Sequence, residues 1–202
     1  MDKFTAPLLK DNFYHIYNRA NNGRRIFYND ENYDFFLQKF GEYLSEFVEL
    51  FAFCLLPNHF HLLIKVKKEL QDLTVLENLP GLNKGVRTIS QAFSNLFNCY
   101  TKAINKQESK YGNLFQRPFK RVVIDKNEYL LRAIYYIHQN PIHHGLCDNM
   151  ECYRWSSYYF LTNKIKSFLS SEAVLNWFGG MTEFREIHRK MLINYKESFV
   201  ME

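Results

Sequence analysis

The spacing of apolar residues predicts two amphipathic helices in the first half of the chain. Between Asp30 and Phe47 the apolar side chains recur every three or four residues, and Asn29 or Asp30 is placed to cap the start. A second run with this spacing extends from Val86 to Ile104. The polar, irregular residues 67–85 before it predict a loop.

Four other segments have the pattern of strands. Phe13–Arg19 is rich in aromatic and branched residues and is followed by an Asn-Asn-Gly turn signal. Leu50–Leu56 is apolar throughout, as in a central strand that is covered on both faces. After a Pro-Asn interruption the apolar pattern resumes at His59–Val66, which predicts two strands joined by a tight turn. Phe119–Ile124 predicts the fourth strand.

A third helix should follow the last strand. Asp125 and Glu128 form a capping signal for a helix over 126–140, which Pro141 should stop at Asn140. The order is then strand, helix, strand, strand, helix, strand, helix. This order predicts an α+β fold of ferredoxin-like type, in which an antiparallel sheet carries helices on one side.

Composition and charge restrict the class of protein only broadly. The chain has 202 residues, of which 47% are apolar, so residues 1–145 can form one domain, with 146–202 as a helical extension packed on it. The net charge of +5 makes a polyanionic partner plausible. The four cysteines lack a framework spacing, the N-terminus lacks a secretory core, and no apolar run reaches about 18 residues, so we expect a reduced, cytoplasmic protein without a membrane span.

Two histidines on one predicted strand are candidate metal ligands. Because residues two apart in a strand face the same way, His59 and His61 should project side by side while Phe60 and Leu62 face the core. Two neutral imidazoles can hold one divalent ion if a third ligand is present. The alternative is that they are simply two polar surface residues.

The third helix offers a nucleophile and that third ligand. Residues four apart in a helix lie one above the other, so Arg132, Tyr136 and Asn140 share one stripe. A phenol can attack phosphorus, and the Asn140 amide oxygen could complete a metal site. Tyr135 and Gln139 have the same spacing, but Tyr135 adjoins the apolar stripe, so we assign Tyr136 as nucleophile and Tyr135 as packing.

Basic residues between the second helix and the last strand are candidate DNA contacts. Arg117, Lys120 and Arg121 lie among aromatic residues, where cations can neutralise phosphates while rings stack on unpaired bases. A solvated helix face followed by a core strand would give the same pattern without any DNA contact.

Six segments along the chain read, in order, YHIYNRANNGRRIF, LPNHFHLLI, YTKAINKQ, GNLFQRPFKRVVI, YIHQNPIHHGL and YRWSSY. With these segments, most of the chain resembles the HUH single-tyrosine transposases of the insertion-sequence-200 type, especially REP-associated tyrosine transposases. The family's His-hydrophobic-His motif matches His59 and His61, and its Tyr-x-x-x-Asn pattern matches Tyr136 and Asn140. A related Tyr-x-x-x-Gln pattern would match Tyr135 and Gln139 instead.

The resemblance implies an activity. Residues 1–145 would be an HUH endonuclease-like catalytic domain that binds Mg²⁺ or Mn²⁺ and cuts single-stranded DNA beside hairpin-forming repeats. The cut would leave a 5′-phosphotyrosyl link and a free 3′-hydroxyl, which allows rejoining. Apart from the resemblance, the positions of the basic residues lead us to expect that Arg117, Lys120, Arg121 and Arg132 contact the DNA. We expect a nucleoid-associated protein, and both a monomer and a homodimer fit.

Other classes of protein stay open beside the resemblance. The chain departs from the family after Pro141, where two histidines and, further on, Cys147 and Cys152 could suggest zinc, but their spacing matches no standard zinc site. A ferredoxin-like sheet with aromatics and basic loops is also typical of non-catalytic RNA-recognition modules. A degenerate transposase and a metallonuclease that uses water would also fit this sequence.

Overall fold

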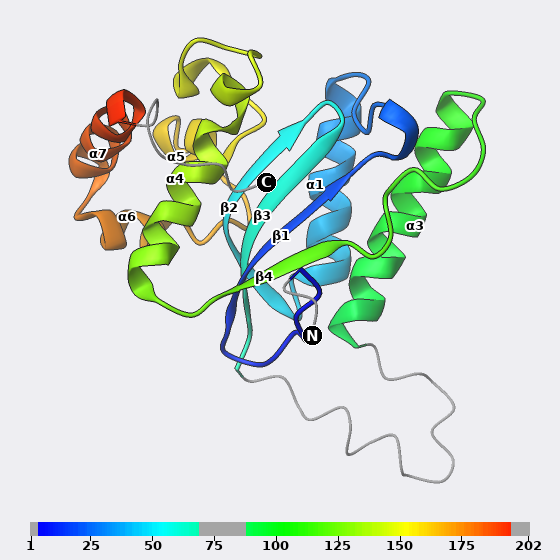
Figure 1. Cartoon of the computed structure of the whole chain (residues 1–202), viewed down its shortest axis with the longest axis horizontal. Coiled ribbons are helices and arrows are strands. Elements are labelled where there is room, and N and C mark those ends of the chain that lie inside the picture. The colour runs from blue at the N-terminus through cyan, green and yellow to red at the C-terminus, as the bar shows by residue number, and fades with distance from the viewer. Residues whose placement is uncertain (1–3, 69–87, 195–202) are drawn as a thin grey trace, which may run out of the picture.

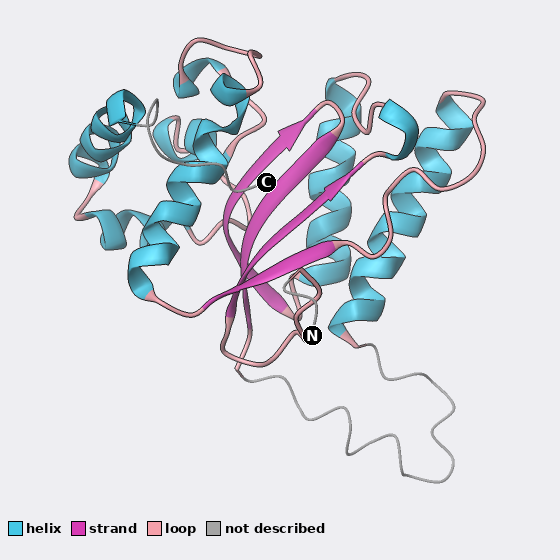
Figure 2. Cartoon of the chain, viewed as in Figure 1, coloured by secondary structure: helices cyan, strands magenta, loops and turns pink. Residues whose placement is uncertain are grey.

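The computed structural model describes residues 4–68 and 88–194 and contains a four-stranded antiparallel sheet (Figures 1 and 2). The strands β1 (Phe13–Arg19), β2 (Val48–Leu56), β3 (His59–Val66) and β4 (Lys120–Ile124) follow the spatial order β2-β3-β1-β4. Each pair of neighbours is antiparallel. This is the strand order of a ferredoxin-like fold, so the predicted fold class is confirmed.

Two helices lie side by side on one face of the sheet, α1 (Asp30–Leu44) and α3 (Ile89–Gln107) (Figure 1). The side chains of Asn29 and Thr88 cap their first turns. Phe36 of α1 packs against both Phe60 of β3 and Tyr100 of α3, which joins sheet and helices in one aromatic core. The part of the predicted loop after residue 68, and the predicted helix start at Val86, fall outside the described residues.

The helix α1 is shorter than its apolar pattern predicts. It ends at Leu44, with Ser45 as its C-cap, and β2 begins at Val48. Phe47 is nevertheless buried, because it enters the core from the connecting turn and not from a further helical turn. Apolar spacing therefore predicted the burial of Phe47 correctly but its backbone conformation wrongly.

The helix α4 (Asn127–His143) packs on the opposite face of the sheet, against β2 and β3 (Figure 1). The prediction that Pro141 stops this helix at Asn140 is wrong. A proline in the last turn removes only one backbone donor, and the turn closes with a hydrogen bond from the His144 N–H to the Asn140 carbonyl, 3.0 Å from N to O. The start also differs, since Lys126 is the N-cap and makes no side-chain capping bond.

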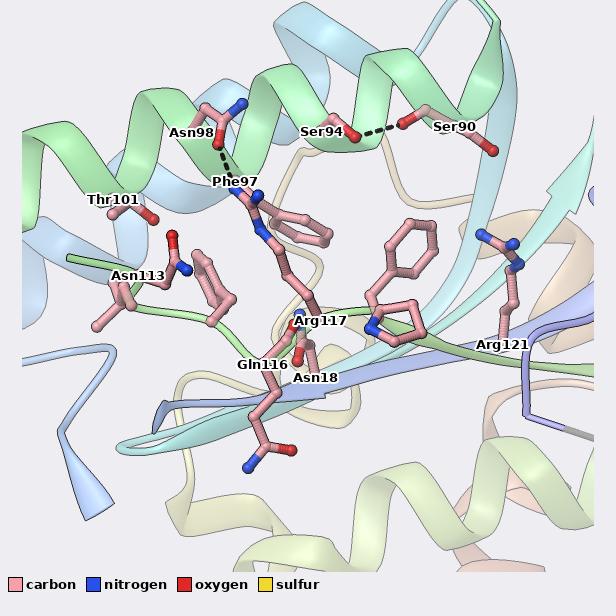
Figure 3. Close-up of a pocket in the computed structure, with 14 residues that line it drawn as sticks. Asn18, Ser90, Ser94, Phe97, Asn98, Thr101, Asn113, Gln116, Arg117 and Arg121 are labelled. Atoms are coloured by element: carbon pink, nitrogen blue, oxygen red, sulfur yellow. Dashed lines mark hydrogen bonds between the residues drawn. The ribbon is translucent and has the colours of Figure 1, made fainter. Parts of the chain in front are cut away.

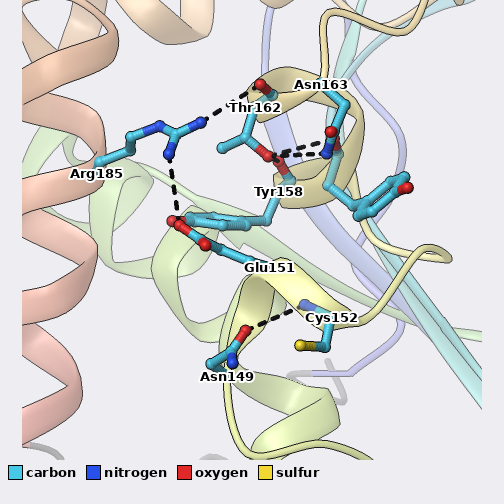
Figure 4. Close-up of polar contacts among 8 residues, drawn as sticks. Asn149, Glu151, Cys152, Tyr158, Thr162, Asn163 and Arg185 are labelled. Carbon is cyan, nitrogen blue, oxygen red and sulfur yellow. Dashed lines mark hydrogen bonds and ion pairs between the residues drawn. The ribbon is translucent and has the colours of Figure 1, made fainter.

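The C-terminal part of the described chain adds three helices, namely α5 (Ser157–Thr162), α6 (Ser171–Phe178) and α7 (Met181–Asn194), of which α7 contacts α4. Backbone hydrogen bonds from Leu55 to Trp155 and from Ser170 to Leu50 join this part to β2. Within it, Arg185 of α7 reaches the Glu151 carboxylate at 3.5 Å and the Thr162 carbonyl at 3.4 Å (Figure 4). None of the described helices is long and apolar enough to cross a membrane.

Candidate active site

Both motif histidines of β3 project from the face of the sheet that α4 covers. Alternation along the strand sends Phe60 toward α1 and α3, while His61 faces Tyr136 of α4. Only 5% of His59 and 4% of His61 is exposed. The alternative that they are ordinary surface residues is therefore wrong, because polar side chains this deeply buried must find specific partners.

Each of the two histidines has one ring nitrogen in a hydrogen bond that suits a metal ligand. His59 Nδ1 lies 2.7 Å from Asn58 Oδ1, so Nδ1 carries the proton and Nε2 keeps a lone pair. His61 Nδ1 lies 3.0 Å from Nε2 of His15, a residue of β1. His61 Nε2 is buried and has no hydrogen-bond partner among the residues that the structure describes. Such outer hydrogen bonds are typical of imidazoles that bind metal through the opposite nitrogen.

Burial keeps these imidazoles neutral at pH 7. It lowers the pKa of His15 to about 4 and that of His59 to about 3, and the neighbouring His144 lowers the pKa of His59 further. The pKa of His61 lies well below its ordinary value, first because of burial and then because of His15 and His59. Neutral rings keep the lone pairs that a cation needs.

Tyr136 is directed at the histidines, whereas Tyr135 is not. The ring of Tyr136 lies edge-on to His61 and His15, with centroid distances of 5.6 Å and 5.8 Å. Tyr135, rotated by one residue around α4, has its ring 5.6 Å from that of His188 in α7. The two tyrosines that sequence patterns could not fully separate thus face different parts of the molecule.

Asn140 lies one helical turn beyond Tyr136 on the same stripe of α4. Its Nδ2 donates to the Tyr136 carbonyl at 2.8 Å, and its buried Oδ1 has no hydrogen-bond partner in the described part of the chain. One turn further on, His144 Nε2 lies 3.2 Å from His59 Nε2. The stripe from Tyr136 through Asn140 to His144 therefore runs along the two histidines of β3.

The donor set fits a divalent cation only if an amide takes part. Within residues 4–68 and 88–194, no three His, Cys, Asp or Glu side chains are gathered for an ion. Two buried neutral imidazoles and the Asn140 Oδ1 atom nevertheless supply two nitrogens and one oxygen, of which His61 Nε2 and Asn140 Oδ1 are unsatisfied. A bound cation would satisfy both atoms, but Gln139 Oε1 is also buried without a partner among the described residues, so this condition does not by itself single out Asn140.

A cavity of about 220 Å³ opens in front of His59, His61 and Tyr136, and Asn140 is not among the described residues that line it. Arg19 and Lys120 are the cationic residues among its described lining, and they can neutralise a phosphate that enters. The residues that line it are His15, Tyr17, Asn18, Arg19, His59, His61, Gln116, Lys120 and Tyr136. This lining, drawn from the described ranges, contains no acidic residue.

The predicted DNA-contacting cations divide into three groups. Lys120 lines the histidine cavity, and Arg117 and Arg121 line a separate groove beside α3. Arg132 is exposed on the first half of α4 and lines neither cavity. Arg132 therefore shares the helical stripe of Tyr136 but not its cavity.

The sequence analysis missed several residues of the site, among them His15, Arg19 and His144. His15 and Arg19 enter because β1 pairs with β3 in a register that sets Tyr17 opposite His61. His144 enters because α4 continues past Pro141. The available signal was the alternation of His15, Tyr17 and Arg19 in the first strand, and it becomes informative only when the strand pairing is known.

Comparison with known proteins gives a likeness at the level of the fold. No family model and no curated protein matches the chain. Among solved structures, it is similar to one described as a REP-associated tyrosine transposase bound to a REP hairpin, with a TM-score of 0.61 and 15% identity. The match covers 83% of this chain and 90% of that one. At this identity the likeness shows a shared α+β fold over most of both chains.

Proposed function

We propose that this protein is a metal-dependent endonuclease and strand transferase for single-stranded DNA, with Tyr136 as its nucleophile. The observation that carries the proposal is the position of the Tyr136 ring against His61 and His15, in a cavity whose described lining holds two cations and no acid. A phenol, a candidate metal site and a phosphate-compatible cavity lie together. The fold shared with a tyrosine transposase supports the same assignment.

The proposed reaction exchanges one phosphoester bond for another. The Tyr136 oxygen attacks the phosphorus of a DNA phosphodiester, and the bond from phosphorus to the 3′-oxygen breaks. The proton lost by the phenol is balanced by the proton that the leaving oxygen gains as it becomes a free 3′-hydroxyl. The DNA 5′-phosphate is left bonded to tyrosine. Attack by a 3′-hydroxyl on this link reverses the step, so strands can be rejoined without an external energy source.

The residues of the chain have separate roles in this scheme. His59 and His61 through Nε2, and Asn140 through Oδ1, would hold Mg²⁺ or Mn²⁺, which when bound polarises the phosphate. Asn58 and His15 orient the two imidazoles through their hydrogen bonds. Arg19 and Lys120 neutralise the phosphates that flank the reacting one.

Hairpin-forming repeats are the proposed substrates. The solved neighbour is described as bound to a REP hairpin, and this chain shares its fold over most of its length. A cavity of about 220 Å³ accommodates a phosphate and its immediate surroundings, which favours a flexible single strand at the cleavage point. We therefore place the scissile phosphate in the unpaired DNA beside a hairpin.

The decisive test is a covalent adduct. Labelled single-stranded DNA with a hairpin is incubated with the protein and Mn²⁺, and the product is resolved by denaturing electrophoresis. Wild type and Tyr135→Phe should form a labelled protein band, and Tyr136→Phe should form none. An adduct lost only in Tyr135→Phe would move the nucleophile by one residue.

Two other results would change the proposed class of protein. Cleavage without an adduct, retained in Tyr136→Phe, would indicate a metallonuclease that uses water. DNA binding without cleavage across a library of genomic hairpins would indicate a non-catalytic nucleic-acid-binding module or a degenerate transposase.

A further inference from the structure

A second cavity, which we call the α3 groove, lies between α3 and the segment leading into β4 (Figure 3). Its volume is about 470 Å³, within the range of about 300–1,000 Å³ typical of sites for small ligands. One wall is a polar face of α3, where Ser90, Ser94, Asn98 and Thr101 follow one another at helical spacing. The opposite wall is formed by residues 113–119 and by Arg121.

The chemistry of the α3 groove suits one unpaired nucleotide. Three aromatic rings line it, those of Phe97, Phe115 and Phe119, and its charged residues are Arg117 and Arg121, with no acid among the described lining residues. Neutral amides and hydroxyls can bond the edge of a base, and guanidinium groups can stack on its face. The three rings are at most 9% exposed and pack on one another, so they contribute a small apolar surface to the groove. A cationic lining without carboxylates also tolerates the phosphate that every nucleotide carries.

The two arginines are held in the walls of the α3 groove. Arg117 Nη2 donates to Asn98 Oδ1 at 3.2 Å, so this side chain reaches across to α3 (Figure 3). Arg121 Nε donates to the Ala6 carbonyl at 2.6 Å, and its guanidinium lies 5.0 Å from the ring centre of Phe119. Cations that are positioned in advance lose less conformational freedom when an anion binds.

The α3 groove adjoins the histidine cavity. Asn18 and Gln116 line both cavities. They form the connection between them, since Asn18 Nδ2 donates to the Gln116 carbonyl at 3.1 Å and the Gln116 N–H donates to the Arg19 carbonyl at 2.9 Å. A DNA strand with one phosphate at Tyr136 would need only to pass the C-terminal end of β1, at Asn18 and Arg19, to enter the groove.

We propose that the α3 groove binds an unpaired base of the single strand close to the phosphate that Tyr136 attacks. This inference rests on the proposed function and adds a base-reading site to it. Asn98 and Ser94 are the side chains that meet the base edge, and Arg117 meets the adjoining phosphate. The bound base would set which phosphate reaches the nucleophile.

The test measures binding alone, so that it does not depend on cleavage. A labelled hairpin with a single-stranded flank is titrated with the protein in EDTA, in a Tyr136→Phe background, and followed by fluorescence anisotropy. Ser94→Trp fills the α3 groove without changing charge and should weaken binding about tenfold or more. The matched control is Asn95→Trp, whose site is the next residue of α3 and does not line the groove, and its affinity should stay within about twofold.

Abasic substitutions identify the base that enters. Each nucleotide of the flank is replaced in turn by an abasic site, and one position should weaken binding to the wild-type groove but have little effect on Ser94→Trp or Asn98→Ala. Asn98 is exposed, so Asn98→Ala keeps the comparison valid even if the bulky variant does not fold. Wild-type binding by both groove variants, or equal abasic effects in all proteins, would overturn the inference. Failure of the proposed function would appear separately: the groove would bind DNA as expected in this test, but the protein with Tyr136 intact would form no covalent adduct with Mn²⁺ present.

Discussion

The Nε2 atoms of His59 and His144 lie 3.2 Å apart. Since His59 Nδ1 donates to Asn58, its Nε2 atom must accept the proton of His144 Nε2. The atom that would bind the metal is thus engaged by a residue of the segment in which the chain departs from its transposase-like pattern. A metal ion at His59 has to displace this hydrogen bond.

Removing that competitor should tighten metal binding. A neutral hydrogen bond contributes about 0.5–1.5 kcal/mol, so His144→Ala should raise the affinity for Mn²⁺ by a few-fold, measured by isothermal titration calorimetry. His143→Ala is the neighbouring control and should leave the affinity unchanged. A tenfold loss in His144→Ala would instead make His144 a metal ligand.

The metal role of His61 can be separated from its role in the core. His61→Asn keeps a side-chain amide that can bond His15 but lacks an atom at the Nε2 position, so it should abolish Mn²⁺ binding and cleavage. Because His61 is buried, His61→Ala should also destabilise the fold by about 2 kcal/mol or more, leaving a cavity and an unpaired His15. Urea unfolding of both variants measures the difference, and Mn²⁺ binding by His61→Asn at wild-type strength would remove His61 from the metal site.

A matched pair of variants can decide whether Asn140 or Gln139 is the third ligand of the metal ion. Asn140 lies on the stripe with Tyr136 and His144, whereas Gln139 follows Tyr135, which contacts His188. Asn140→Ala should weaken Mn²⁺ binding by about tenfold or more, and Gln139→Ala should have a much smaller effect. The reverse order in a metal titration would assign the third ligand to Gln139.

Acid should destabilise the protein through the buried histidine pair His138 and His188, which lies outside the candidate active site. His188 Nδ1 donates to the Phe184 carbonyl at 2.7 Å and its Nε2 lies 2.9 Å from His138 Nδ1, so both rings are accommodated as neutral groups. Burial lowers the pKa of His188 to about 4. Between pH 6.5 and about 4 the unfolded chain therefore binds more protons than the folded one, and stability falls as the pH falls through this window.

The size of this effect follows from the shift of the pKa of His188. A decrease of the pKa from 6.5 to about 4 corresponds to about 3 kcal/mol of stability that is lost once the pH has fallen below both values. Urea unfolding at pH 7 and pH 4.5 should show a smaller loss for His188→Gln than for wild type, because the variant has one group fewer to protonate. An equal pH dependence in the two proteins would contradict this assignment.

Local sequence patterns predicted most of the secondary structure. The alternation in His59–Val66 correctly separated a histidine face from an apolar face, because successive side chains of any strand point to opposite sides. Helical spacing correctly put Tyr136 and Asn140 on one stripe. The errors lie at helix ends, at Phe47 and at Pro141, where packing and the last hydrogen-bonded turn decide the backbone.

The sequence by itself determined the order of the elements and the side chains that share a face, since these depend on near neighbours along the chain. The ferredoxin-like fold class followed because few folds accommodate that order of elements. Only the tertiary structure decided that His15 and Arg19 join His61, that His144 meets His59, and that Tyr135 and Tyr136 face different partners. These relationships depend on strand register and helix docking, which are set by burial summed over residues far apart in sequence.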